Sequence, residues 1–152
     1  MKRDSKSFLI LCVILAVVSF VIITQDSYGQ NTGRTSDAQL LARAINGEAR
    51  GEPYEGQVAV GAVILNRVKS PDFPNTIAGV IYQPGAFTAV ADGQINVPID
   101  PNSTVYKAAQ DALNGWDPTH GCLYYWNPAT ATSKWIWSRK VVVKIGKHNF
   151  GK

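Results

Sequence analysis

The stretch from Glu55 to Val68 constrains the fold of this chain more than any other. Its apolar residues cover nearly every direction around a helix, and a helix that is apolar all round is a buried one. Asn66 and Arg67 close the stretch, and Pro71 and Pro74 prevent the helix from continuing. The sequence therefore predicts a central core helix against which the other elements pack.

A carboxylate stands on the apolar stripe of the preceding helix, which we expect to run from about Asp37 to Glu48. Glu48 lies at position i+7 of a stripe whose earlier positions i, i+3 and i+4 are Leu41, Ala44 and Ile45. A carboxylate on an apolar face loses solvation of its charged form and can hold a proton near neutral pH. A general acid needs this property.

A structural role for Glu48 is the alternative interpretation. A glutamate at the end of such a stripe often reaches water or pairs with an arginine, and Arg43 and Arg50 are close enough in sequence to serve. Gly47 and Gly51 flank the acid. They either allow backbone or a ligand to come close or mark the end of the helix.

The N-terminal residues 1–29 have the pattern of a secretory signal. Lys2, Arg3 and Lys6 precede an apolar run over residues 8–23, and Ser27 and Gly29 have the small-residue spacing of a cleavage site. An uncleaved membrane anchor is the alternative, although spanning usually takes about 20 apolar residues. Residues 30–36 are polar and are predicted to be a linker. Residues 37–152 then suit one domain, which we expect outside the cytoplasmic membrane.

The charge of the chain is asymmetric. The formal net charge is +4. No acidic residue follows Asp117, whereas six basic residues do: Lys134, Arg139, Lys140, Lys144, Lys147 and Lys152. Such a basic region favours binding to polyanions. In an exported protein, cell-wall polymers or a membrane surface are expected partners rather than nucleic acid, and a merely solvated basic surface is the alternative.

The middle of the chain predicts two more helices separated by an irregular segment. A short helix fits residues 76–81, and a longer one fits residues 101–113 with Gly115 as its C-terminal cap. Residues 83–100 hold Pro84, Gly85, Gly93 and Pro98 and sustain no period. Long irregular connections in a small domain are often binding loops.

The last third of the chain is rich in aromatic residues. All four tryptophans lie between Trp116 and Trp137. Residues 123–126 and 141–145 are predicted strands, with residues 127–139 as a loop or short helix between them. These aromatic residues exceed what one small core absorbs, so we expect some of them to line a groove. Flat aromatic faces and amide side chains suit sugar rings.

Several chemistries find little support in the sequence. His120 and His148 lack metal-ligand spacing, and we expect no metal or other cofactor. No GxSxG motif and no glycine-rich phosphate loop is present. Cys122, flanked by apolar and aromatic residues, is interpreted as a buried, inert thiol rather than a nucleophile.

Cleavage of a glycosidic bond needs few residues. One protonated carboxyl donates its proton to the leaving oxygen, and a second carboxylate is needed if water or the enzyme itself attacks the sugar. Glu48 fits the first role. The spacing singles out no candidate for the second among Glu52, Glu55, Asp92 and Asp100.

Three motifs resemble the spore-cortex-lytic, cell-wall hydrolase family (SleB and CwlJ type). They are INGEARGEPYEGQVAVGAVILNRV (residues 45–68), QPGAFTAVADG (residues 83–93), and YYWNP followed by a tryptophan and a terminal IGKHNF (residues 145–150). The resemblance covers essentially all of residues 37–150. It implies an α+β fold, a mostly helical domain similar to lytic transglycosylases and lysozymes, with a small β element lining a substrate groove.

The resemblance also implies a reaction and its residues. In the family the first glutamate of GEARGE is the catalytic acid, which is Glu48 here. The implied reaction is cleavage of peptidoglycan between N-acetylmuramic acid and N-acetylglucosamine. A lytic transglycosylase needs no second carboxylate, because the muramic 6-hydroxyl attacks internally. Roles in substrate binding are implied for six residues: Gln57, Phe87, Tyr125, Asn127, Trp135 and His148.

The biological setting and two other activities stay open at this stage. Full-length cortex-lytic enzymes of this type carry an N-terminal peptidoglycan-binding domain, which this sequence does not predict. A role in general wall remodelling is therefore an alternative to spore cortex degradation. A non-catalytic wall-binding module and an amidase that uses His120, His148 and a metal are the other hypotheses.

Overall fold

A computed structural model describes residues 36–152, and residues 37–152 form one compact unit. The predicted signal over residues 1–29 lies outside the described residues, as does all of the predicted linker except Ser36. Within the described part, no helix has the length and apolar character needed to cross a membrane.

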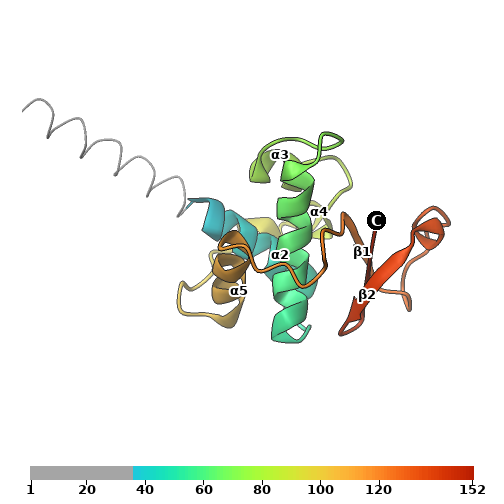
Figure 1. Ribbon diagram of the computed structural model, residues 1–152. Coiled ribbons are helices and arrows are strands. Elements are labelled where there is room, and N and C mark those ends of the chain that lie inside the picture. The colour runs from blue at the N-terminus through green and yellow to red at the C-terminus, as the bar shows by residue number, and fades with distance from the viewer. Residues whose placement is uncertain (1–35) are drawn as a thin grey trace, which may run out of the picture. The chain divides into compact units, whose positions relative to one another are not determined.

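The described chain is mainly helical in its first two thirds and holds a small sheet in its last third (Figure 1). A first helix spans residues 36–49. The elements that follow are α2 (Tyr54–Lys69), α3 (Ile77–Ile81), α4 (Thr88–Ala91), the 3₁₀ turn η1 (Gln94–Asn96), α5 (Thr104–Leu113), β1 (Tyr124–Trp126), the 3₁₀ turn η2 (Ile136–Ser138), β2 (Val141–Ile145) and β3 (His148–Gly151).

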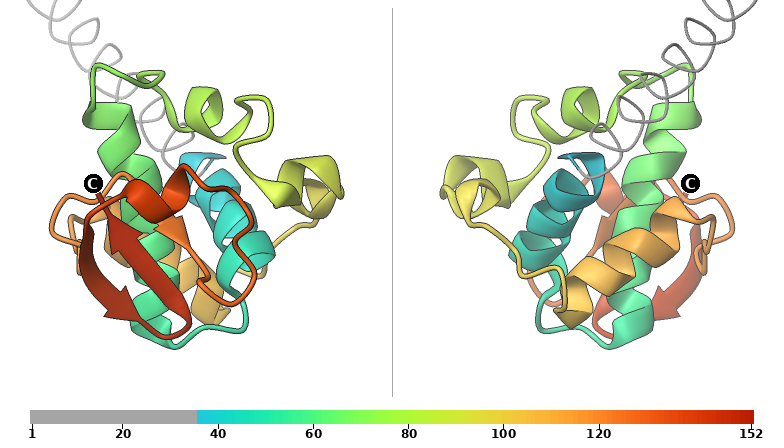
Figure 2. Two further views of the ribbon diagram at one scale, coloured as in Figure 1. Left: turned by 90° about the vertical axis from the view of Figure 1, so that its right-hand side faces the viewer. Right: turned by 90° about the vertical axis from the view of Figure 1, so that its left-hand side faces the viewer.

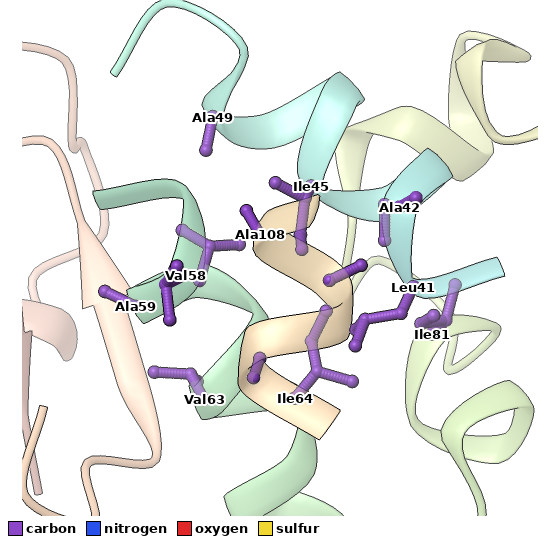
Figure 3. Close-up of a cluster of buried hydrophobic side chains, with 14 of the residues drawn as sticks. Leu41, Ala42, Ile45, Ala49, Val58, Ala59, Val63, Ile64, Ile81 and Ala108 are labelled. Atoms are coloured by element: carbon purple, nitrogen blue, oxygen red, sulfur yellow. The ribbon is translucent and has the colours of Figure 1, made fainter. Parts of the chain in front are cut away.

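Helix α2 is the centre of the core, as its all-round apolar sequence predicts. Every residue from Gly56 to Ile64 is buried. The helix stands between α5 and the sheet (Figures 1 and 2). Gly61 allows its neighbours to come close, since a Cβ there would lie 3.0 Å from Ile45 and 3.1 Å from Ala112. Figure 3 shows side chains of α2, α5 and the helix of residues 36–49 meeting in one apolar cluster.

The helix ends follow local sequence signals. Pro53 precedes α2, and Ser70 follows it with an extended backbone immediately before Pro71. Ser103 caps α5 by accepting a hydrogen bond from the backbone N–H of Tyr106 at 3.2 Å. Beyond the other end of α5, Gly115 has a φ of +104°, a left-handed conformation that glycine adopts without steric cost.

The sheet has three antiparallel strands in the order β1-β3-β2. Strands β1 and β2 lie close to the predicted ranges, whereas the central strand β3 was not predicted. Its pairing places Tyr125 opposite Phe150 on one side and Ile145 opposite His148 on the other. The buried side chains of Ile145 and Phe150 join the sheet to the helical core.

The predicted irregular segment over residues 83–100 contains two short helical turns, α4 and η1, which the sequence pattern did not indicate. Gly93 links the two turns with a φ of +83°. Ala89 and Ile95 are buried, so this connection is anchored to the core at both turns.

Candidate active site

Glu48 lies one residue before the end of the first helix, on the predicted face. The three apolar residues that share its stripe, Leu41, Ala44 and Ile45, are fully buried. Glu48 itself is half-buried. The helix thus carries the carboxylate from the core to the boundary with solvent, where it can meet a ligand.

Both carboxylate oxygens of Glu48 accept hydrogen bonds from distant parts of the chain. The backbone N–H of Ala89 in α4 donates to Oε1 at 3.1 Å, and the hydroxyl of Tyr125 in β1 donates to Oε2 at 3.1 Å. Neither arginine of the alternative interpretation is a hydrogen-bond partner of Glu48 in the structure. Arg50 instead donates to the side chain of Gln94 at 3.2 Å.

Gly47 explains how α4 reaches Glu48. A Cβ at this position would overlap the Cβ of Ala89 and lie 3.4 Å from its Cα. Carbon atoms normally make contact at about 3.5–4.0 Å. No atom lies within 4 Å of a Cβ built on Gly51. Of the two glycines that flank the acid, Gly47 is therefore the one that permits a close approach.

Tyr125 is held for its role as a donor to Glu48. Burial and the neighbouring charge of Glu48 raise the pKa of the Tyr125 hydroxyl well above its usual range, so it keeps its proton. The edge of the His148 ring lies against it, with the ring centroids 5.4 Å apart, and Phe150 lies at 6.2 Å. Strand β3, which the sequence did not predict, supplies both of these neighbours.

Glu52, the second glutamate of GEARGE, occupies a different environment. Its side chain is 7% exposed and accepts a hydrogen bond from the backbone N–H of Lys147 at 2.8 Å. One of its oxygens lies 4.0 Å from Nδ1 of His148. Gln57 is also buried and donates to the backbone carbonyl of Glu52 at 3.1 Å. Glu52 is therefore enclosed by protein groups.

Phe87 lies in a cluster of aromatic rings around one arginine. It is 3% exposed and stands at the N-terminus of α4, two residues before Ala89. The guanidinium of Arg67 lies 5.2–5.8 Å from the ring centroids of Phe73, Phe87 and Tyr124. Nε of Arg67 donates to the carbonyl of Leu123 at 2.7 Å. The sequence did not single out Arg67, because the rings that surround it come from separate segments.

Trp135 and Asn127 lie in the connection between β1 and β2. Trp135 is half exposed, and Arg139 covers one of its faces at 4.4 Å from the ring centroid. Its ring also meets Tyr124 edge-on at 5.0 Å. The side chain of Asn127 accepts a hydrogen bond from the backbone N–H of Ala129 at 2.9 Å and thereby shapes the first turn of this connection.

The side chains that could bind a metal or act as a nucleophile do not gather into a second site among the described residues. Within residues 36–152, no group of three or more His, Cys, Asp or Glu side chains could hold a metal ion. Cys122 is fully buried, and burial raises the pKa of its thiol. His120 is exposed in a turn with a φ of +58°.

Comparison with known proteins identifies the family. The model of the cell wall hydrolase family matches residues 51–151. The chain belongs to this cell wall hydrolase family. Its relatives include the spore cortex-lytic enzymes of Bacillus cereus, 63% identical over 127 residues, and of Bacillus subtilis, 64% identical over 115 residues. These alignments cover 84% and 76% of this chain but 46% and 37% of the two enzymes. The chain thus spans less than half the length of these curated relatives.

A shorter relative and two solved structures extend the comparison. The cell wall hydrolase CwlJ of Bacillus subtilis is 32% identical over 131 residues, which cover 76% of this chain and 84% of CwlJ. The catalytic domain of the Bacillus cereus SleB protein matches with a TM-score of 0.73 and 65% identity, covering 78% of this chain and 91% of that domain. The catalytic domain of the germination-specific lytic transglycosylase SleB from Bacillus anthracis also matches at a TM-score of 0.73, with 66% identity over 76% of this chain and 93% of that domain. The predicted fold, a mostly helical lysozyme-like domain with a small β element, is confirmed.

Proposed function

We propose that residues 37–152 of this chain are a peptidoglycan lytic transglycosylase that cleaves between N-acetylmuramic acid and N-acetylglucosamine. The observation that carries the proposal is Glu48, a half-buried carboxylate that two separate segments fix through hydrogen bonds to both of its oxygens. The 66% identity to a domain described as a germination-specific lytic transglycosylase supports the same reaction.

Glu48 acts first as an acid and then as a base. It donates its proton to the glycosidic oxygen while the bond from that oxygen to C1 of the muramic residue breaks. The resulting carboxylate takes the proton of the muramic 6-hydroxyl as this oxygen bonds to C1, which closes an anhydro ring and restores the acid. Donation from Ala89 and Tyr125 stabilises the carboxylate between the two steps.

A single available carboxylate favours internal attack over hydrolysis. Glu52, the acid closest in sequence, is 7% exposed and already accepts a hydrogen bond from Lys147, so it is poorly placed to activate a water molecule. Glu55, Asp92 and Asp100 are exposed and make no hydrogen bond to Glu48 or its two donors. Attack by the substrate's own hydroxyl requires no second acid from the protein.

The predicted binding residues divide into three groups in this proposal. Trp135, which is half exposed, and Asn127, which lies at the start of the same connection, are available to contact sugar rings. Tyr125 contacts Glu48. Gln57, Phe87 and His148 are buried and act by supporting the groups around Glu48 rather than by stacking on the glycan.

The test is mass spectrometry of soluble products released from purified spore cortex and from vegetative sacculi. Residues 30–152 and their Glu48→Gln form are compared, because the amide keeps the size of the side chain and cannot donate the acidic proton. Anhydro-muropeptides from the wild type alone support the lyase. Reducing sugar ends would identify a hydrolase, and free amines that disappear with a chelator would identify an amidase. A wild type that binds sacculi but releases nothing would be a wall-binding module.

We further propose that residues 1–29 direct export, with residues 30–36 as a linker, and that the protein acts in the spore cortex or the vegetative cell wall. The names of the relatives support action on the cortex, and the basic, apolar and small-residue pattern of residues 1–29 supports export. Fractionation of the producing cells, with sequencing of the mature N-terminus, separates a cleaved signal from a retained anchor.

The basic C-terminal region is proposed to contact anionic wall polymers or a membrane surface. Five of its lysines, Lys134, Lys140, Lys144, Lys147 and Lys152, are exposed. No acidic residue after Asp117 opposes them. Sedimentation with teichoic acid-containing walls, and separately with anionic vesicles, tests each source of phosphate. Binding that persists in 1 M salt, where charge attraction is screened within about 3 Å, would contradict the proposal.

A further inference from the structure

A chain of contacts leads from the turn between β2 and β3 to Glu48. It begins at Glu52, whose carboxylate accepts a hydrogen bond from the backbone N–H of Lys147 at 2.8 Å. Gly146 in the same turn has a φ of +57°, and a Cβ there would overlap a carboxylate oxygen of Glu52. Glu52 and this turn therefore fix one another.

His148, the first residue of β3, is the next member. Its side chain is buried, and its Nδ1 has no hydrogen-bond partner while lying 4.0 Å from Glu52. Burial lowers the pKa of His148, an effect that the negative charges of Glu52 and Glu48 oppose and the positive charge of Lys147 reinforces. The imidazole is therefore neutral near pH 7.

The ring of His148 then supports Tyr125. The two rings meet edge-on with an interplanar angle of 80° and centroids 5.4 Å apart, an arrangement that aromatic pairs favour. Tyr125 has Phe150 as its other ring neighbour, and its hydroxyl donates to Glu48. The orientation of this hydroxyl thus depends on where His148 lies.

We propose that Glu52 and His148 are positioning residues, which act on Glu48 through Tyr125. This inference rests on the proposed function of Glu48 as acid and base. Glu52 holds the turn, the turn and the sheet hold His148, and His148 fixes the ring whose hydroxyl binds the reacting carboxylate. Neither residue touches the glycan.

The proposal assigns a pH dependence to His148. Protonation creates an imidazolium 4.0 Å from the carboxylate of Glu52 and draws the ring toward it. This movement changes the contact of the ring with Tyr125, whose hydroxyl binds Glu48. Activity should therefore fall on the acid side as His148 takes up its proton.

The first experiment compares His148→Phe with His148→Ala in turnover of purified sacculi. His148→Phe keeps an aromatic ring against Tyr125 and should retain activity within about threefold at pH 7 while losing the acid limb of the pH profile. His148→Ala removes the ring and should lower turnover by about tenfold or more, with little change in the substrate concentration for half-maximal rate. His120→Asn, which removes the other histidine at an exposed turn, is the matched control and should leave the profile unchanged.

A double-mutant comparison tests whether His148 acts through Tyr125. Tyr125→Phe removes only the hydroxyl, and adding His148→Ala to it should cost much less activity than His148→Ala costs alone. Fully multiplicative losses, or a His148→Phe profile identical to that of the wild type, would overturn the proposal. Thermal unfolding of each variant separates these effects from a loss of folding.

A measurement without turnover distinguishes failure of this proposal from failure of the proposed function. In the nuclear magnetic resonance spectrum, the Tyr125 ring signals should shift with the same midpoint as those of His148, and His148→Phe should abolish the shift. Coupled shifts in a protein that releases no anhydro-muropeptides would refute the lyase and retain the positioning role. Uncoupled shifts in an active enzyme would refute the positioning role alone.

Discussion

Replacing Gly47 by alanine tests whether the close packing of α4 on the first helix places a hydrogen-bond donor on Glu48. The new methyl carbon would overlap the Cβ of Ala89, where carbon atoms normally stay about 3.5 Å or more apart. To restore a normal contact distance, α4 must move outward by about 1 Å. The bond from Ala89 to Glu48, now 3.1 Å, would then lengthen to roughly 4 Å, beyond hydrogen-bonding distance.

Two opposing energies decide the stability of this variant. Overpacking costs about 1–3 kcal/mol, whereas alanine is about 1 kcal/mol better than glycine inside a helix. We therefore expect a net loss of about 1 kcal/mol, which lowers the melting temperature by about 4 °C in a domain of this size. The effect on turnover should be larger, about 10- to 100-fold, because a small displacement of a catalytic group is costly.

Gly51→Ala is the matched control within the same motif. Gly51 has no atom within 4 Å of a built Cβ and no positive φ, so its replacement should change stability by less than about 0.5 kcal/mol. Release of muropeptides and thermal unfolding are measured for both variants. A Gly47→Ala protein with unchanged turnover, or equal losses in the two variants, would refute the assigned role of close packing.

Three further predictions concern stability and reactivity. Burial raises the pKa of Cys122, so its thiol should resist alkylation at pH 8 in the folded protein and react once urea unfolds it; fast labelling of the native state would contradict its burial. Arg67→Lys should lower the free energy of unfolding, measured in urea, by about 1–3 kcal/mol, because it removes the Nε–H donor and the planar contacts to three rings. Arg50→Lys, at an exposed site, should lower it by less than about 0.5 kcal/mol. Burial lowers the pKa of His148, so below about pH 6.5 the unfolded chain binds this proton more readily than the folded protein does, and the fold loses stability. The melting temperature of His148→Phe should therefore fall less between pH 7 and pH 5 than that of the wild type. An equal fall in the two proteins would contradict this.

The periodicity of the sequence predicted the helical part of the fold well. Residues 55–68 and 101–113 were expected to be helical, and α2 and α5 lie close to these ranges, because their apolar patterns and flanking proline, serine and glycine signals are local. Strand β3 escaped prediction because its sequence, His148–Gly151, includes Asn149 and Gly151, two residue types that are depleted in strands. Its position as the central strand arises from pairing with β1 and β2, which no local pattern records.

The candidate site was predictable only as far as one helix carries it. Glu48 stood out because it occupies an apolar stripe, and this placement needs no tertiary information. Its two donors come from positions 41 and 77 residues further along the chain. The cluster around Arg67 likewise joins rings from three segments. The family resemblance pointed to Tyr125, but its bond to Glu48 depends on the fold.

The two glutamates of GEARGE show how the end of a helix separates chemical roles. Four residues apart on a continuous helix, Glu48 and Glu52 would share one face and one environment. The first helix instead ends at residue 49, and the backbone N–H of Glu52 bonds to the carbonyl of Ala49 in a turn. This turn carries Glu52 to the loop between β2 and β3, where Lys147 and His148 enclose its side chain, and leaves Glu48 at the boundary with solvent. Extending the helix through residue 52 would bring the two carboxylates together, and their repulsion would oppose the first step of the proposed reaction, in which Glu48 gives up its proton and becomes charged.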